Sequence, residues 1–304
     1  ALTQAINEAK TVTLFVGAGV KDAREQVLKL AEKIKAPIGH ALGGKMYIQY
    51  ENPFDVGMNG LLGYGAAHEA THEADLLILL GTDFPYNDFL PDANVAQVDI
   101  NGSHIGRRTK ISYPVTGDVA ATIENILPHV DEKKDRSFLD KMLKKHYGKL
   151  EHVVEAYTSN VDKHTPIHPE YVADLIDRNA DEDAIFTVDT GMCNVWGARY
   201  ITANGKREQI GSFRHGTMAN ALPQALGAQA ANPGRQVITF SGDGGLSMLM
   251  GELLTVKLHN LPIKMFVFNN SSLGMVKLEM LVQGLPEHET DHESVNFAKI
   301  AEAS

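Results

Sequence analysis

The sequence has 304 residues, enough for two domains with separate cores, and its 43% hydrophobic and 22% charged residues are ordinary proportions for a globular protein. A formal net charge of -10, with acids and bases interspersed, argues against a nucleic-acid partner, which would need a basic face. The single cysteine, Cys193, excludes an internal disulfide and is interpreted as buried packing. There is no membrane-spanning apolar run and no signal-peptide pattern, so a cytoplasmic protein is expected.

The N-terminal part of the chain alternates strand-like and helix-like patterns. The β-rich run Thr11–Val16 leads into a glycine turn, and residues 23–34 follow as a helix that ends before Pro37. One face of this helix is apolar: Ala23, Val27, Leu30, Ala31 and Ile34. Further buried strands are predicted at Leu76–Leu80 and Val95–Ile100. Continuous apolar strands that alternate with helices predict a parallel sheet covered on both faces.

A charge-rich segment over residues 129–164 comes next. Its apolar residues form one helical stripe: Phe138, Met142, His146, Leu150 and Val153. We interpret the segment as a solvated surface helix, without chemistry, that links two domains and ends before Pro166.

A second α/β pattern begins at Pro169. Its predicted strands are Ala184–Val188, Val237–Phe240 and Ile263–Phe268. The fold class expected is therefore α/β, with two three-layer domains that contain parallel sheets and are joined by a helical linker. The expected ranges are 1–128 for the first domain, 129–164 for the linker and 165–304 for the second domain.

The segment Ser241–Gly245 follows one buried strand of the second domain, and Asn269 and Asn270 end the next. The connection between these strands is a right-handed crossover, so both strand ends lie at the edge of the sheet where ligands bind. Asp243 and Asn270 offer oxygen ligands of the kind that Mg²⁺ prefers. The glycines let a phosphate approach the backbone, and a helix that starts near Leu246 points its N–H groups at it. The pattern predicts a diphosphate held through one divalent cation.

This combination resembles the pattern of thiamin-diphosphate-dependent enzymes. The resemblance implies that the side chains of Asp243 and Asn270 and the main-chain oxygen of Ser272 bind the cation. It also implies that Met218 supports the bent cofactor, although a methionine in a glycine-rich turn more often fills a gap in a core. The residues implied at thiamin diphosphate are Gly216, Thr217, Met218, Asp243, Gly244, Gly245, Asn270, Ser271, Ser272, Leu273, Gly274 and Met275.

Several segments are similar to bacterial pyruvate oxidases, especially the quinone-reducing kind. They include HGTMANALPQALGAQ, SGDGGLSMLMGELLTV and FNNSSLGMV in the second domain, and APIGHALGGK, NPFDVGMNGLLG, GTDFPY and VDINGSHIG in the first. The resemblance implies that the first domain binds FAD, and a carboxylate at a strand end suits ribose hydroxyls. The residues implied at FAD are Asn59, Gly60, Leu61, Leu62, Thr82, Asp83, Phe84, Pro85, Tyr86 and Asp99.

The reaction implied by this resemblance is oxidative decarboxylation of pyruvate with thiamin diphosphate, Mg²⁺ and FAD. Electrons would pass to quinone or oxygen, and acetate or acetyl phosphate would form. Met275 matches a mobile position near the active site and is the one candidate catalytic residue. Relatives begin with a further domain that supplies a catalytic glutamate, so this chain is expected to be an inactive piece of a larger polypeptide. A homodimer or homotetramer is expected, with peripheral association at the inner membrane face only through a C-terminal segment outside this chain.

Three alternatives stay open at this point. An acetolactate-synthase-like carboligase has the same domains, with a flavin that does not turn over. A plain 2-oxo acid decarboxylase has no flavin. A non-catalytic binding fragment would have no turnover at all.

Two other groups of residues are interpreted as structural. Gly17 and Gly19 do not complete a dinucleotide-binding fingerprint, because Asp22 stands where the third glycine belongs, so they predict only a tight turn. His68 and His72 are predicted to be surface histidines, because no complete set of metal ligands accompanies them.

Overall fold

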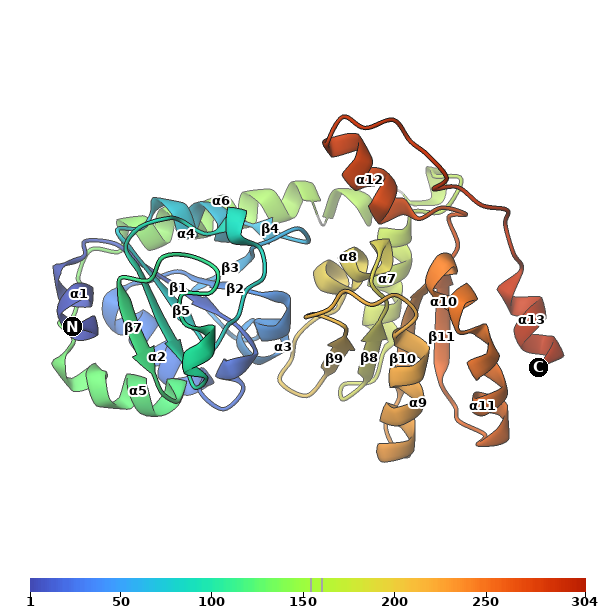
Figure 1. Ribbon diagram of the computed structural model, residues 1–304, viewed down its shortest axis with the longest axis horizontal. Coiled ribbons are helices and arrows are strands. Elements are labelled where there is room, and N and C mark those ends of the chain that lie inside the picture. Colours follow the sequence, from blue (N-terminus) through green and yellow to red (C-terminus); the bar gives the residue numbers. More distant parts are fainter. Residues whose placement is uncertain (154, 160) are drawn as a thin grey trace. The chain divides into compact units, whose positions relative to one another are not determined.

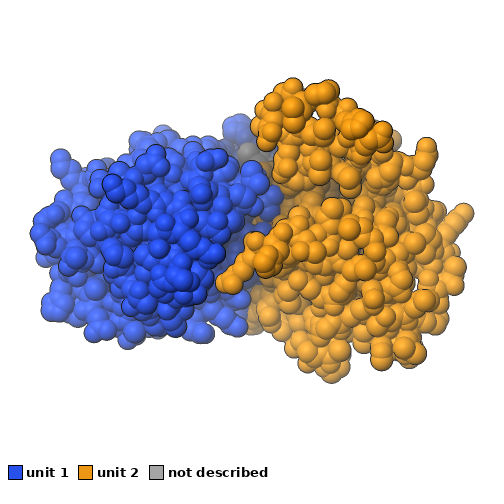
Figure 2. Space-filling model, viewed as in Figure 1, with its two compact units in different colours: residues 1–159, 203–205 blue, residues 160–202, 206–304 orange. Residues whose placement is uncertain are grey.

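The computed structural model describes residues 1–153, 155–159 and 161–304. The chain forms two compact units, which Figure 2 distinguishes by colour. Unit 1 comprises Ala1–Ser159 with Ala203–Gly205, and unit 2 comprises Asn160–Thr202 with Lys206–Ser304. The three-part division at residues 128 and 164 stays a prediction, and residues 154 and 160 of the predicted linker lie outside the described residues. None of the described helices is long and apolar enough to cross a membrane.

Unit 1 is built on a seven-stranded sheet in the order β4-β3-β2-β1-β5-β6-β7 (Figure 1). All neighbouring strands are parallel except β3 and β4, which are antiparallel. The strands are β1 (Val12–Val16), β2 (Ile38–His40), β3 (Asp55–Met58), β4 (Tyr64–Gly65), β5 (Leu76–Leu80), β6 (Val95–Asp99) and β7 (Tyr113–Thr116). The helices are α1 (Leu2–Glu8), α2 (Arg24–Ile34), α3 (Lys45–Ile48), α4 (Ala67–Glu73), α5 (Val119–Ile126) and α6 (Ser137–Val153).

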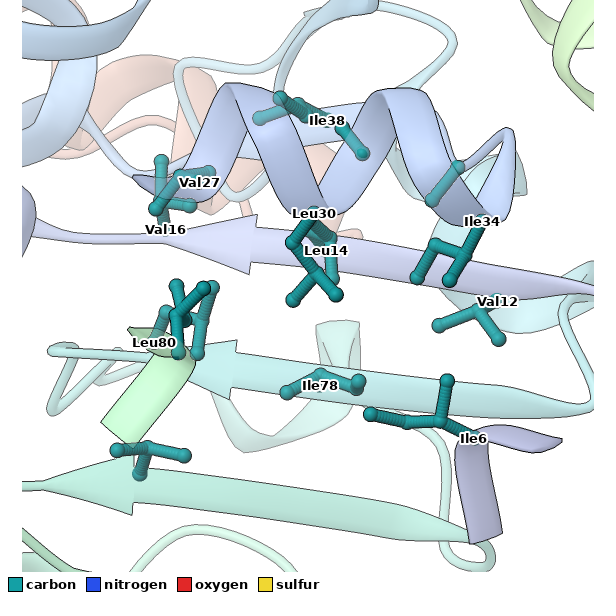
Figure 3. Packing of buried hydrophobic residues seen from close by; sticks show 14 of the residues in the cluster. Ile6, Val12, Leu14, Val16, Val27, Leu30, Ile34, Ile38, Ile78 and Leu80 are labelled. Atoms are coloured by element: carbon teal, nitrogen blue, oxygen red, sulfur yellow. The ribbon is translucent and has the colours of Figure 1, made fainter. Parts of the chain in front are cut away.

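The apolar stripe of α2 packs on the central strands of this sheet. Val27, Leu30 and Ile34 face the side chains of β1, and every residue of β1 and β5 is buried (Figure 3). The helix ends at Ile34 because Lys35 adopts a left-handed conformation, with φ of 51°, two residues before Pro37. The predicted helix and its apolar face are therefore confirmed.

Helix α6 packs against the rest of unit 1. Its Leu139 and Met142 are fully buried, and His146 is 4% exposed. On the solvent side, Lys141 and Lys145 form ion pairs with Glu73 of α4, and Lys149 pairs with Glu69. Phe138, Met142 and His146 of the predicted apolar stripe thus lie against the first unit, while most of the charged side chains of the helix are exposed, as expected of a surface helix.

A buried polar cluster lies beneath α6. Nε2 of His40 is 3.7 Å from Oδ1 of Asp55, and Nε2 of His146 is 3.9 Å from Oδ2. Burial lowers the pKa of His40 to about 3, with a further contribution from the charge of Lys45, and lowers the pKa of His146 to about 4. Burial raises the pKa of Asp55 to about 7. The folded unit therefore favours neutral forms of all three side chains.

The stability of unit 1 is expected to fall as the pH is lowered from 7 to 5. The pKa of each histidine is lower in the folded state than its ordinary 6.5, so the unfolded chain takes up protons that the folded unit does not. The raised pKa of Asp55 has the opposite effect on stability, because the folded unit takes up a proton at this carboxyl group before the unfolded chain does. The two histidines together outweigh this single group. Replacing His146 by glutamine should remove about 2 kcal/mol of the acid-induced loss between pH 7 and 5.

Urea unfolding of unit 1 at several pH values, followed by circular dichroism, would measure this difference. His152, an exposed histidine on the same helix, supplies the matched control through His152→Gln. If both variants lose stability with acid as steeply as the unchanged protein, the titration of His146 does not contribute.

Unit 2 contains a four-stranded parallel sheet in the order β11-β10-β8-β9. The strands are β8 (Ile185–Val188), β9 (Glu208–Gly211), β10 (Val237–Gly242) and β11 (Lys264–Phe268). The helices are α7 (Pro169–Asn179), α8 (Met192–Tyr200), α9 (Ala221–Ala231), α10 (Asp243–Met248), α11 (Leu253–Leu258), α12 (Gly274–Val282) and α13 (Phe297–Ala303). From β8 the chain crosses over to β9 at one side of β8, and it then returns to β10 at the other side. Because the two crossovers run in opposite directions and each is right-handed, α8 and α9 lie on opposite faces of the sheet. The predicted α/β fold class is confirmed.

Candidate active site

A cavity of about 240 Å³ lies at the carboxyl edge of the unit 2 sheet. Because β8, β10 and β11 are parallel, the turns that follow them meet at this edge. Four segments line the cavity: residues 190–193 after β8, the turn before α9, residues 242–245 at the end of β10, and residue 270 with residues 272–276 after β11. A hollow of about 750 Å³ elsewhere in unit 2 is larger, but no carboxylate lines it. The smaller cavity is therefore the candidate site.

Asp243 joins the ends of two strands. It is the first residue of α10 and is 3% exposed. Its Oδ1 accepts the N–H of Gly244 at 2.8 Å, and its Oδ2 accepts the N–H of Ser271, beyond β11, at 2.6 Å. The helix begins here, three residues earlier than the start predicted near Leu246. The carboxylate is thus fixed by main-chain donors at the edge of the cavity.

The turn after β11 brings Asn270 to the same cavity. Oδ1 of Asn270 accepts the N–H of Ser272 at 3.2 Å, and Ser271 has a left-handed φ of 53°. A Cβ at Gly274 would lie 2.9 Å from Nδ2 of Asn270, so the glycine lets this amide lie close to the start of α12. Asp243, Asn270 and Ser272 all line the cavity, as the sequence predicts for a shared cation site.

Gly244 forms the floor beneath two apolar side chains. A Cβ there would lie 2.8 Å from Cδ2 of Leu273 and 3.4 Å from Cε of Met218. Both side chains line the cavity beside the glycines. This arrangement leaves backbone accessible on one wall and provides an apolar surface on the other, which fits a ligand with a charged end and a ring.

The donor set fits Mg²⁺ with a diphosphate. Among residues 1–153, 155–159 and 161–304, no three histidine, cysteine, aspartate or glutamate side chains form a metal-binding group. A cation beside Asp243 would therefore take its other ligands from amide and main-chain oxygens, water and the ligand itself. Mg²⁺ typically binds in this way, through one or two carboxylates and the oxygens of a phosphate.

Ten of the twelve residues predicted at thiamin diphosphate line the cavity, and Thr217 and Ser271 do not. The N–H of Thr217 donates to Oγ of Ser212 at 3.1 Å, and Ser271 contacts the cavity only through its bond to Asp243. Nine further residues line the cavity and were not predicted at thiamin diphosphate: Thr190, Gly191, Met192, Cys193, Trp196, Gly242, Phe268, Val276 and Glu279. Five of these follow β8, so the strand-end rule, applied to the predicted strand Ala184–Val188, could have found them.

Cys193 and Trp196 contribute an apolar wall. Cys193 is 2% exposed, and burial raises the pKa of its thiol to about 12, which leaves it protonated and unreactive. Trp196, the only tryptophan of the chain, lies over Phe268 with a centroid distance of 4.7 Å. The indole is therefore a natural optical reporter of this cavity.

The residues predicted at FAD lie at the carboxyl edge of the unit 1 sheet, in the loops after β3 and β5 and at Asp99, the last residue of β6. Nδ2 of Asn59 donates to the carbonyl of Phe89 at 2.9 Å. Gly60, with φ of 107°, packs under the rings of Phe84 and Tyr86. Leu61 is 55% exposed. These loops share one edge, and their assignment to FAD stays a prediction.

Two acidic residues of this edge already have partners. Asp83 forms ion pairs with Arg107 and Arg108 at 3.0 and 3.2 Å. Oδ1 of Asp99 accepts the N–H of Asn101 at 2.8 Å. The predicted ribose carboxylate at Asp99 is thus held in place by its own loop.

The residues interpreted as structural behave accordingly. A Cβ at Gly17 or Gly19 would lie within 2.7 Å of the backbone of Gly81, so this glycine pair permits close packing of two strand ends. His68 and His72 are exposed on α4, with ring centroids 4.3 Å apart.

Comparison with known proteins supports the choice of this cavity as the candidate site. Residues 1–126 match the family described as thiamine pyrophosphate enzyme, central domain, and residues 189–304 match the one described as thiamine pyrophosphate enzyme, C-terminal TPP binding domain. The second match contains every residue that lines the cavity. The chain therefore belongs to the thiamin-diphosphate-dependent enzyme family.

Individual relatives agree at the level of the family. YdaP of Bacillus subtilis (strain 168), provisionally named as thiamine pyrophosphate-containing, is 35% identical over 99% of this chain and 52% of its own length. The acetolactate synthase large subunit of Mycobacterium tuberculosis (strain CDC 1551 / Oshkosh) is 32% identical over 98% of this chain and 50% of its own length. The acetolactate synthase isozyme 1 large subunit of Escherichia coli (strain K12) is 30% identical over 89% and 48%. The chain spans about half the length of these relatives.

Proposed function

We propose that the whole protein is an enzyme that uses thiamin diphosphate and Mg²⁺ to act on a 2-oxo acid, and that this chain supplies the site for the diphosphate. The observation that carries the proposal is the position of Asp243. Its buried carboxylate joins the ends of β10 and β11 at the edge of a cavity that Asn270 and Ser272 also line. One anionic oxygen among neutral oxygens suits a divalent cation that is shared with a diphosphate.

The roles of the chain's residues follow from this placement. The side chains of Asp243 and Asn270 and the main-chain oxygen of Ser272 would hold the cation. Met218 and Leu273 would support the rings of the cofactor, over the floor formed by Gly244. When bound, thiamin diphosphate supplies a carbon nucleophile for the carbonyl of the substrate. The protonated thiol of Cys193 leaves that chemistry undisturbed.

Carboligation is the specific reaction that the relatives favour. Two of the proteins described above are acetolactate synthase large subunits, and their similarity covers most of this chain. Under this proposal, pyruvate is both donor and acceptor, and a flavin in unit 1 has no redox turnover.

Pyruvate oxidation is the second candidate. It is supported by the sequence segments NPFDVGMNGLLG and GTDFPY, which resemble pyruvate oxidases, and by YdaP, whose name does not specify a carboligase. Under this proposal FAD in unit 1 accepts electrons and passes them to quinone or oxygen. Both candidates include assembly into a homodimer or homotetramer.

One experiment on the full-length protein distinguishes the candidates. The protein is loaded with thiamin diphosphate, Mg²⁺ and FAD, and pyruvate is added without oxygen while the visible flavin band is recorded. Acetolactate formation with an unchanged flavin band is the expected result for the carboligase, and bleaching of the band without acetolactate indicates the oxidase. Failure to consume pyruvate and other 2-oxo acids would contradict both.

A further inference from the structure

A buried carboxylate, that of Asp189, lies behind the candidate site. Asp189 follows β8 directly and is 1% exposed. It does not line the cavity, although its neighbour Thr190 does. Among the described parts of the chain, no basic side chain forms an ion pair with it. A carboxylate buried in this way is costly unless oriented donors surround it.

The donors around Asp189 come from the turns that form the cavity. Its Oδ1 accepts the N–H of Ala221, the first residue of α9, at 2.8 Å. Nδ2 of Asn220 lies 3.4 Å from the same oxygen. Burial raises the pKa of Asp189, and main-chain hydrogen bonds from Ala221, Asn220 and Gly242 oppose that rise. The carboxylate therefore connects the start of α9 with the turn after β10.

The second oxygen of Asp189 faces Gly245. A Cβ at Gly245 would lie 2.5 Å from Oδ2 of Asp189 and 3.4 Å from the nitrogen of Ala219. The missing side chain of Gly245 thus points at Asp189 and away from the cavity. This close approach fixes the first turn of α10, which begins with Asp243, against the turn that contains Met218.

We propose that Asp189 is a positioning residue for the cofactor: its carboxylate holds the Met218 turn and the Asp243 turn in register across the cavity. The inference rests on the proposed function, because it takes the relative position of the two turns to serve the binding of the cofactor. Without the carboxylate, the support for the rings and the ligand for the cation are no longer held at a fixed separation.

The test uses the full-length protein and isothermal titration calorimetry. Affinity for thiamin diphosphate is measured at saturating Mg²⁺, at a temperature where circular dichroism shows each variant to be folded. Asp189→Asn keeps the shape but turns one acceptor into a donor that faces main-chain N–H groups. Binding should weaken by about tenfold or more, as on loss of an outer partner of a metal site.

Gly245→Ala tests the same contact from the other side and supports the experiment if Asp189→Asn does not fold. It should weaken binding similarly, and the double variant should be no weaker than the worse single variant, because both changes disrupt one contact. Gly227→Ala, on α9 with no atom within 4 Å of the added Cβ, is the matched control and should bind as the unchanged protein does.

Each outcome has a defined meaning. If folded Asp189→Asn and Gly245→Ala bind thiamin diphosphate with unchanged affinity, the positioning role is refuted while the proposed function stands. If the unchanged protein itself shows no Mg²⁺-dependent binding, the proposed function fails, and this inference fails with it.

Discussion

Replacing Asp243 by alanine is expected to abolish Mg²⁺-dependent binding of thiamin diphosphate by the full-length protein. The change removes the carboxylate that joins the ends of β10 and β11 and leaves the N–H groups of Gly244 and Ser271 without their acceptor. We expect affinity to fall by about 100-fold or more, equivalent to about 2.7 kcal/mol. Isothermal titration calorimetry with thiamin diphosphate, at several Mg²⁺ concentrations, measures the loss.

Two further variants sharpen this result. Asp243→Asn keeps the oxygen but loses the charge, so its affinity should lie between those of the alanine variant and the unchanged protein. Asp183→Ala removes an exposed carboxylate of the same unit and should leave binding unaltered. Binding by Asp243→Ala with an unaltered dependence on Mg²⁺ would rule out the cation site and the proposed function.

A large loss of stability is expected in unit 2 when Asp177 is replaced by alanine. Its Oδ1 accepts hydrogen bonds from Nη1 of Arg207 at 2.7 Å and from the N–H of Thr202 at 2.8 Å, and its Oδ2 accepts the hydroxyl of Thr202 at 2.6 Å. The side chains of Asp177 and Arg207 are 11% and 9% exposed. Removing one partner leaves a buried charge, and the free energy of unfolding should fall by about 3–5 kcal/mol.

Denaturant unfolding followed by Trp196 fluorescence measures this change, because the indole belongs to unit 2. Asp174, on the same helix, forms a partly exposed ion pair with Arg178, and Asp174→Ala should cost less than about 1 kcal/mol. Equal losses in the two alanine variants would show that burial of the Asp177 pair has no special effect.

The strands that could be predicted from the sequence are those whose apolar composition alone determines their structure. Every residue of β1 and β5 is buried, and continuous apolar runs predicted both strands to within one residue. Strand β9 (Glu208–Gly211) was not predicted, because its residues are mixed in character and only pairing with β8 makes them a strand. The stripe on α6 was visible, but the surface that covers it depends on tertiary packing.

The same distinction applies to the site. Asp243 and Asn270 could be predicted to share one edge, because a right-handed crossover between two recognisable strands leaves no other arrangement. Asp189 could not be assigned a role, since an acid after a strand is common. Its importance depends on Ala221 and Gly245, which are 32 and 56 positions away along the chain and close only in the folded unit.

The position of β11 has a consequence for the behaviour of this chain in solution. It is the outermost strand beside β10, and apolar residues around it, including Phe266 at 36% exposure, remain partly open to solvent. The outward N–H and C=O groups of such a border form a template onto which an extended segment of another molecule can add. Lys264 at the first position of the strand is the charge that counters this addition. Within the described part of unit 2, β11 is therefore the position at which a further strand, from the same polypeptide or from another molecule, can extend the sheet.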